Sequence, residues 1–181
     1  MFMFTVNIKG KLRVIKRILN SPTAEIKVRK LAKELGISPA HVSKTLKALR
    51  DEGIVKDGRV DLSAPMARAL KVFLNVERLV EIGVVDEIKS LGGVAGAGIY
   101  GSWANGTNHE DGDLDLWIRI EKHPGEMKVA SLVGEIRKSV GAEVQMLVLT
   151  PEDLERLRRE DPAFYHSLVF GSFVMWGEPI G

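Results

Sequence analysis

The chain has 181 residues, of which 45% are hydrophobic and 28% charged, and it contains no cysteine. This composition is typical of a soluble globular protein, and the lack of thiols excludes disulfide bonds and zinc–thiolate sites. No apolar run of the sequence is long enough to span a membrane, and residues 1–6 are too short and lack the basic leader of a signal peptide, so we expect a cytoplasmic protein with no membrane partner.

Charge is distributed unevenly along the chain. Residues 1–80 contain 17 Lys/Arg and seven Asp/Glu, whereas residues 81–181 contain nine Lys/Arg and 17 Asp/Glu. Such asymmetry is typical of a basic module that binds polyanions, joined to an acidic module with another task. The alternative is that the acidic clusters at 110–115 and 152–161 are only solvated surface.

Three helices are predicted in the basic half. Apolar residues recur at helical spacing over residues 11–19 and again over residues 28–35, and Gly36 ends the second helix. Ser38 and Pro39 then begin a third helix, because serine caps helix N-termini and proline fits the first helical position.

A hairpin follows the third helix. Gly53 ends that helix, and residues 54–62 predict two short strands joined by a turn at Asp57-Gly58. Helices followed by a hairpin in this order indicate a winged helix-turn-helix. Residues 31–55 also resemble the winged-helix DNA-binding families of transcription regulators.

This resemblance implies that the outer face of the third helix lies in the major groove of double-stranded DNA. We expect Lys44 and Lys47 to contact phosphate or base, Ser43 to contact phosphate, and Arg59 in the wing to reach the DNA backbone. The alternatives are a protein–protein module or a merely solvated lysine-rich face, since arginine, the commoner base reader, is absent from this face until Arg50.

Residues 64–92 predict a helical connector. A long helix is expected over residues 65–82 and a short one over residues 84–91, and no Gly/Ser-rich tether separates the two modules. The predicted organisation is therefore a winged helix-turn-helix domain at residues 1–63, this connector, and a third part at residues 93–181.

The third part predicts a mixed sheet with helices on one face. Residues 101–112 are predicted to form a loop, and Thr150 to cap a helix that begins at Pro151. The remaining elements are strands at residues 94–100, 113–120, 142–149 and 173–177 and a helix at residues 127–140.

A glycine–serine pair, Gly101-Ser102, precedes two aspartates, Asp113 and Asp115, with ten residues between. Side chains alternate along a strand, so the two carboxylates point the same way and repel each other unless a cation lies between them. Oxygen ligands suit Mg²⁺ (or Mn²⁺), while glycine and a hydroxyl allow close approach to phosphate. The alternative is an exposed acidic strand edge.

At these residues the chain resembles the polymerase-β-type nucleotidyltransferases, and most closely the minimal nucleotidyltransferases. Their signature is Gly-Ser, about ten residues, and Asp-x-Asp. The similarity extends to Tyr100 and Gly106, whereas Gly112 stands where many members carry serine. The resemblance implies an α+β fold in which the winged helix-turn-helix is joined by helices to a nucleotidyltransferase-fold mixed sheet with flanking helices, its second strand antiparallel to the first.

The resemblance also implies roles for the motif. Asp113 and Asp115 are the expected catalytic metal ligands, and Gly101 and Ser102 are expected to hold the terminal phosphates of the nucleotide. Family members use a third carboxylate from the third strand, for which Glu143 is the candidate here.

The identity of this third group stays open in the sequence. Gln145 shares a strand face with Glu143 and aligns where the acid is often found. If Gln145 occupies that place, the site loses a negative charge and a base for the attacking hydroxyl, which lowers the rate by roughly 10²- to 10⁴-fold.

These features predict a Mg²⁺-dependent nucleotidyltransferase that moves a nucleoside monophosphate from an NTP, with ATP as the first choice, to a hydroxyl of a protein, small molecule or RNA end. The winged helix would bind nucleic acid or a partner. The alternative is a DNA-binding transcriptional regulator or antitoxin whose transferase domain binds nucleotide with little or no turnover. Minimal nucleotidyltransferases resemble the antitoxin half of toxin–antitoxin pairs, which makes a toxin one expected protein partner and acceptor.

Overall fold

The computed structural model of the chain describes residues 8–181. It consists of two compact units, Met1–Lys71 and Val72–Gly181, whose boundary lies within helix α4 (Pro65–Glu81). The domain boundaries at residues 63 and 92 that we expected from the sequence stay a prediction. Across the described residues, no helix combines the length and the apolar character needed to cross a bilayer.

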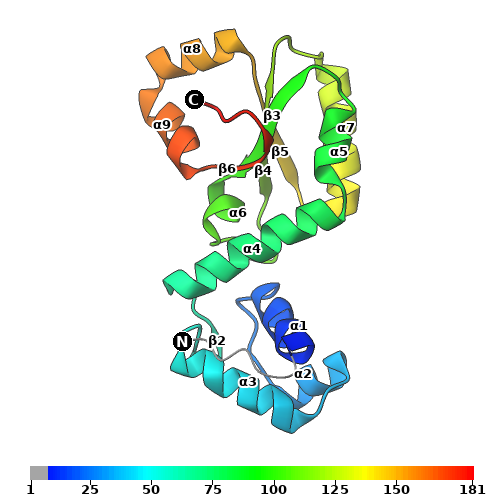
Figure 1. Cartoon of the computed structure of the whole chain (residues 1–181), viewed down its shortest axis with the longest axis vertical. Helices are drawn as coiled ribbons and strands as arrows, with labels where there is room; N and C mark the ends of the chain where they lie inside the picture. Colours follow the sequence, from blue (N-terminus) through cyan, green and yellow to red (C-terminus); the bar gives the residue numbers. More distant parts are fainter. Residues whose placement is uncertain (1–7) are drawn as a thin grey trace. The chain divides into compact units, whose positions relative to one another are not determined.

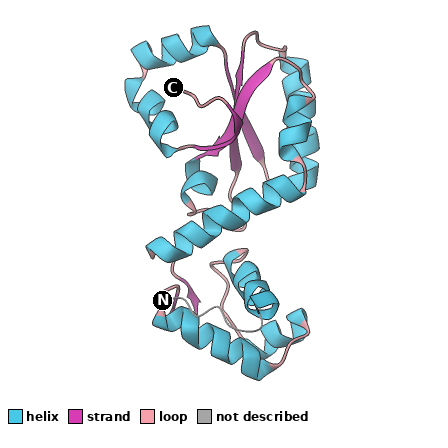
Figure 2. Cartoon of the chain, in the orientation of Figure 1, coloured by secondary structure: helices cyan, strands magenta, loops and turns pink. Residues whose placement is uncertain are grey.

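The described part of the first unit contains three helices and a hairpin, and then the start of α4 (Figures 1 and 2). Ser38 accepts a hydrogen bond from the His41 backbone N–H at 3.3 Å, and Pro39 takes the first helical position, as predicted. The elements are α1 (Ile8–Leu19), α2 (Val28–Leu35), α3 (Pro39–Asp51), β1 (Val55–Lys56) and β2 (Arg59–Val60).

The hairpin turn has the geometry that its sequence demands. Asp57 and Gly58 have φ values of 50° and 74°, and Val55 pairs with Val60 across the turn. Two consecutive residues in the left-handed region are typical of a type I′ turn, whose twist matches that of the flanking strands. The predicted winged helix-turn-helix arrangement of helices and hairpin is therefore confirmed.

The second unit is built around a four-stranded sheet of order β5-β4-β3-β6. β3 is antiparallel to both of its neighbours, as expected for the first two predicted strands, and β4 and β5 are parallel. The strands are β3 (Val94–Tyr100), β4 (Leu114–Ile120), β5 (Val144–Leu149) and β6 (Phe173–Gly177). This mixed sheet with flanking helices confirms the predicted α+β class.

Helices cover both faces of this sheet, so the expectation of helices on one face is wrong (Figure 1). Helices α5 (Val84–Lys89) and α7 (Glu126–Val140) cover one face, and α8 (Pro151–Glu160) and α9 (Pro162–Gly171) lie on the other. The second layer is needed because Trp117, which alternates to the same face as Asp115, is itself fully buried.

The glycines of β3 make room for this second layer. A Cβ at position 98 would lie 2.7 Å from the Trp117 ring, and a Cβ at position 96 would lie 2.0 Å from the Glu178 carbonyl oxygen. Both approaches are closer than atoms tolerate, so only glycine fits at these positions. Ala97 and Ile99, which point to the opposite face, are buried in the core beneath α5 and α7.

Candidate functional site

The two aspartates lie at the end of the sheet where β4 and β5 begin and β3 ends. Asp115 is partly buried on β4, and Asp113 is exposed just before that strand. The neighbours of Asp115 in the sheet are Tyr100 on β3 and Gln145 on β5. These side chains share one face of the sheet, the face that α8 and α9 cover farther along.

The electrostatics of this end of the sheet disfavour negative charge. Burial raises the pKa of the Asp115 carboxyl above its usual value, and the neighbouring Asp113 charge raises it further. Burial also raises the pKa of the Tyr100 hydroxyl, with the Asp115 charge as the second cause. A cation bound near the two carboxylates would lower the pKa of Asp115 and of Tyr100, because a positive charge favours their ionised forms.

Gly101 is held against Asp115. Its φ is +63°, and a Cβ at this position would lie 2.3 Å from Asp115 Oδ2. The backbone at Gly101 therefore approaches the carboxylate as closely as a side-chain-free residue allows. Ser102 follows at once and is partly buried. Their predicted role in binding the nucleotide stays a prediction, but the two residues and Asp115 lie together.

The predicted loop at residues 101–112 is wrong in its first part, which forms the short helix α6 (Gly101–Asn105). Gly106, with φ of 74°, ends this helix, and the Thr107 N–H donates to the Ser102 carbonyl at 3.0 Å. Trp103 of α6 is 3% exposed and belongs to the core beneath α5 and α7, so its role is packing.

A buried amide network that the sequence analysis missed fixes the segment after α6. Asn75 Nδ2 donates to the Trp103 carbonyl and to Asn108 Oδ1, both at 2.9 Å. Asn75 and Asn108 are 4% and 3% exposed. The available signal was an asparagine within the apolar stripe of a predicted helix, because such a polar residue is buried only with partners.

The structure brings Gln145, rather than Glu143, into contact with the aspartates. Gln145 Nε2 donates to Asp113 Oδ2 at 3.0 Å. The Glu143 carboxylate is exposed and pairs with Arg137 of α7 at 2.7 Å, while its backbone carbonyl accepts from the Leu114 N–H at 2.8 Å. Glu143 is thus next to the site along the backbone, and its catalytic role stays a prediction.

The donor set fits a hard divalent cation. Asp113 and Asp115 offer only oxygen, one is exposed and the other partly so, and Mg²⁺ is usually held by one or two carboxylates together with waters and phosphate oxygens. Within residues 8–181 no three His, Cys, Asp or Glu residues converge as a metal-binding group. Any cation held here would therefore need ligands from a nucleotide or water.

The predicted nucleic-acid residues are exposed in the first unit. Ser43, Lys44 and Lys47 lie on α3, on the side opposite its buried residues, and Arg59 lies on β2. Their contact with DNA stays a prediction. The buried residues of α3 are Val42, Thr45, Leu46 and Leu49.

Two further cations of this unit were missed. Arg29 and Lys30 are exposed in the first turn of α2, where no acidic residue lies and no side chain caps the helix. Free N–H groups and the helix dipole favour anions at such an end. The signal was the basic run at residues 27–30.

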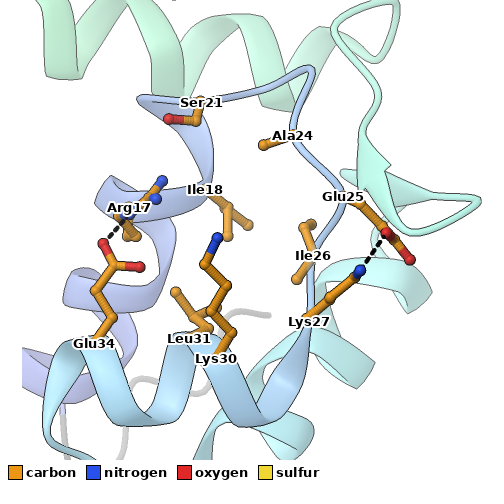
Figure 3. A pocket seen from close by; sticks show the side chains of 10 residues that line it. All are labelled: Arg17, Ile18, Ser21, Ala24, Glu25, Ile26, Lys27, Lys30, Leu31 and Glu34. Carbon is orange, nitrogen blue, oxygen red and sulfur yellow. Dashed lines mark hydrogen bonds and ion pairs between the residues drawn. The ribbon is translucent and has the colours of Figure 1, made fainter.

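A recess of the first unit lies between α1, α2 and the segment that joins them (Figure 3). Ion pairs between Arg17 and Glu34 and between Lys27 and Glu25 lie at its edge. Because both carboxylates already have cationic partners and none of the predicted site residues lines the recess, we assign it to packing. Its lining is Arg17, Ile18, Ser21, Ala24, Glu25, Ile26, Lys27, Lys30, Leu31 and Glu34.

Comparison with known families gives two matches. Residues 82–170 match the family described as nucleotidyltransferase domain, and residues 9–57 match the family described as bacterial regulatory protein, arsR family. Both resemblances inferred from the motifs are confirmed. No curated protein matches the chain.

Two solved structures similar to this chain are toxin–antitoxin complexes. One is a toxin–antitoxin with AMP-PNP, at 16% identity over 57% of this chain and 74% of that one, with a TM-score of 0.43. The other is a tri-AMPylated Shewanella oneidensis HEPN toxin in complex with MNT antitoxin, at 14% identity over 59% and 73%, with a TM-score of 0.39. Sequence identities and TM-scores this low support no argument about function.

Proposed function

Because the chain joins a nucleotidyltransferase domain to an ArsR-type helix-turn-helix domain, we propose that it transfers a nucleoside monophosphate from an NTP to an acceptor hydroxyl. The observation that carries this proposal is that Asp115 and the preceding Asp113 lie at the same end of the sheet, with Gly101 against Asp115. ATP is the first-choice donor and Mg²⁺ or Mn²⁺ the proposed metal. We place the protein in the cytoplasm, where NTPs and DNA are both present.

In the proposed reaction the acceptor oxygen attacks the α-phosphorus of the NTP. The bond from that phosphorus to the bridging oxygen breaks, pyrophosphate leaves with the bond's electrons, and the hydroxyl proton passes to a base. Asp113 and Asp115 would hold the metal, which supplies charge neutralisation when bound. The Gly101 N–H and the Ser102 hydroxyl would orient the terminal phosphates so that the reacting atoms are in line.

Among the described residues, no basic side chain contacts the aspartates in a position to accept the proton of the attacking hydroxyl. Gln145 donates a hydrogen bond to Asp113 and has no basic atom to offer. Glu143 is the proposed base, and it would have to leave Arg137 to act. That pair is exposed, and exposed pairs contribute only about 0–1 kcal/mol, so the exchange costs little.

The test is transfer of α-labelled ATP by the full chain, with Mg²⁺ or Mn²⁺, to components of a cell extract. We expect label on an acceptor with the native chain and its loss with Asp113→Asn/Asp115→Asn. Asp111→Asn/Glu121→Gln, which neutralises two exposed acids on either side of β4, is the matched control. Equal labelling by the site variant and the native chain would contradict the proposal.

The acceptor is a further part of the proposal. Protein, small molecule and RNA end remain the candidates, and the resemblance to minimal nucleotidyltransferases makes a partner protein such as a toxin the first to examine. Mass spectrometry of the labelled acceptor distinguishes these classes by the residue or end group that gains the nucleotide.

A second candidate function is a transcriptional regulator whose nucleotidyltransferase domain binds nucleotide without turnover. The ArsR-type match and the exposed Lys44 and Lys47 favour it. Specific DNA selected from a random pool, with no label transferred under any condition, is the result that would support this function over the first.

A further inference from the structure

An aromatic side chain of α9 lies next to Tyr100, the neighbour of Asp115 in the sheet. The Phe164 ring of α9 contacts the Tyr100 ring edge to face, with centroids 6.5 Å apart and planes at 71°. Tyr100 is the neighbour of Asp115 across β3 and β4 and packs against the cluster around Trp117. Phe164 therefore contacts the aromatic residue that neighbours Asp115 in the sheet.

Phe164 is well supported but not covered. Its side chain is 36% exposed, and Tyr100 is its aromatic neighbour. Its backbone N–H donates to Asp161 Oδ1 at 3.0 Å, and Pro162 takes the first position of α9. Helix α9 also contacts α6, which carries Gly101 and Ser102. Helix α9 thus presents a partly exposed aromatic ring near the segment proposed to bind phosphates.

We infer that Phe164, supported by Tyr100, is the platform on which the base of the nucleotide stacks. This inference rests on the proposed function, because it needs the triphosphate to lie against the aspartates and the Gly101-Ser102 segment. The base would then contact Phe164 while the phosphates lie at the aspartates, with Tyr100 in contact with Phe164 and next to Asp115. Such a platform reads the flat face of the base rather than its hydrogen-bonding edge.

Stacking without edge recognition defines the substrate class. Every base has a π face, so several NTPs are accepted, and purines, which offer the larger area, bind more tightly than pyrimidines. Loss of the platform lowers affinity by roughly 5- to 150-fold, the equivalent of the range measured for one stacked base.

The test compares the binding of ATP, CTP and inorganic tripolyphosphate to the full chain by calorimetry with Mg²⁺. For Phe164→Ala we expect ATP affinity to fall roughly 5- to 150-fold, the ATP-to-CTP ratio to shrink, and tripolyphosphate affinity to stay unchanged. Phe164→Trp keeps a stacking surface and should retain ATP binding. Phe170→Ala removes an 82% exposed ring of the same helix and should change none of the three.

Two results with Phe164→Ala, and two with the native chain, overturn the platform. Unchanged ATP affinity in Phe164→Ala removes it directly, and an equal loss of ATP and tripolyphosphate assigns Phe164 to the fold of the site. If the native chain binds neither ATP nor tripolyphosphate, the proposed function fails and the platform with it. If it binds tripolyphosphate as tightly as ATP, only the platform fails.

Discussion

At position 101 the requirements of the backbone and of the site coincide. Alanine there must adopt φ near +63° and would place its Cβ 2.3 Å from Asp115 Oδ2. We expect Gly101→Ala to lower the free energy of unfolding by about 1–3 kcal/mol and to weaken ATP binding, because the carboxylate has to move. Urea denaturation and calorimetry measure the two effects.

The matched control is Gly134→Ala in α7. This glycine lies in a helix interior with ordinary backbone angles, and a methyl group added to it would meet no atom within 4 Å. Alanine there should raise the free energy of unfolding by about 0.5–1 kcal/mol. A Gly101→Ala protein as stable as the native chain would contradict our interpretation of position 101.

The raised pKa of Asp115 predicts a pH dependence of stability. The folded chain binds this proton more tightly than the unfolded chain, whose carboxyl titrates near 3.8. The associated stability is therefore present below that value and is lost as the pH rises through the raised pKa. We expect the melting temperature of Asp115→Asn to exceed that of the native chain by a margin that grows as the pH rises over this interval. Calorimetry from about pH 4 to about pH 8 measures this difference.

A divalent cation bound at the two aspartates should also stabilise the folded chain. Mn²⁺ or Mg²⁺ should raise the melting temperature of the native chain near neutral pH and have no effect on Asp113→Asn/Asp115→Asn. Asp111→Asn, which is exposed outside the β4 face, should respond to the cation like the native chain. A pH-independent difference between Asp115→Asn and native protein would contradict the assignment.

A carboxylate in place of Gln145 should increase the affinity of the site for metal. Gln145→Glu places a third carboxylate within contact of Asp113, and we expect Mn²⁺ to bind about tenfold more tightly, which corresponds to about 1.4 kcal/mol of added attraction. Electron paramagnetic resonance of free Mn²⁺ measures the affinity without any turnover. Gln145→Leu is the control that removes the hydrogen bond without adding charge, and equal Mn²⁺ affinity in the two variants would rule out a role for charge at this position.

Among the elements, those with a cap signal were predicted well. Ser38-Pro39 and Thr150-Pro151 located the starts of α3 and α8, and Asp57-Gly58 located the hairpin. Helix α9 was missed although Asp161-Pro162 gives the same kind of signal, because apolar residues on several sides of it hide the helical period. The missing helix is also why the second layer over the sheet was not predicted.

The positions of the predicted site residues, though not their roles, follow from one strand and the turn before it. Asp113 and Asp115 are brought together by strand alternation, and Gly101 reaches Asp115 through the antiparallel pairing of β3 and β4. The Gln145–Asp113 contact depends on the register of two parallel strands, and the register is not visible in either segment. The position of Asn75 in an apolar stripe indicates a buried polar residue, but its partners lie in a segment distant in the sequence and are not visible in that pattern.

Helix α8 depends on its N-terminal capping box. The Thr150 hydroxyl accepts from the Asp153 N–H at 3.2 Å, and Asp153 accepts from the Thr150 N–H at 3.2 Å. Thr150→Ala should lower the free energy of unfolding by about 1 kcal/mol. Ser131→Ala, exposed within α7, should change it by less than about 0.5 kcal/mol, and a similar loss in both variants would argue against the cap.

At the scale of the whole molecule, the uneven charge predicts salt-dependent binding of DNA. Lys44→Ala/Lys47→Ala should weaken binding and reduce the slope of log affinity against log salt by roughly 1.8, if both lysines contact phosphate. Filter binding between about 50 and about 200 mM salt measures the slope. Lys122→Ala/Lys128→Ala, which removes two exposed lysines of the acidic half, is the control. An unchanged slope in the α3 variant would contradict major-groove docking.

The packing of Trp117 beneath Gly98 has an optical consequence. All three tryptophans and both tyrosines of the chain lie in the second unit. The indole of Trp117, two residues after Asp115 on the same strand, is fully buried. The tryptophan and tyrosine emission of this protein therefore originates in its second unit, with a blue-shifted component from Trp117. The first unit contributes no tryptophan or tyrosine fluorescence, so its unfolding has to be followed through the circular dichroism of its helices.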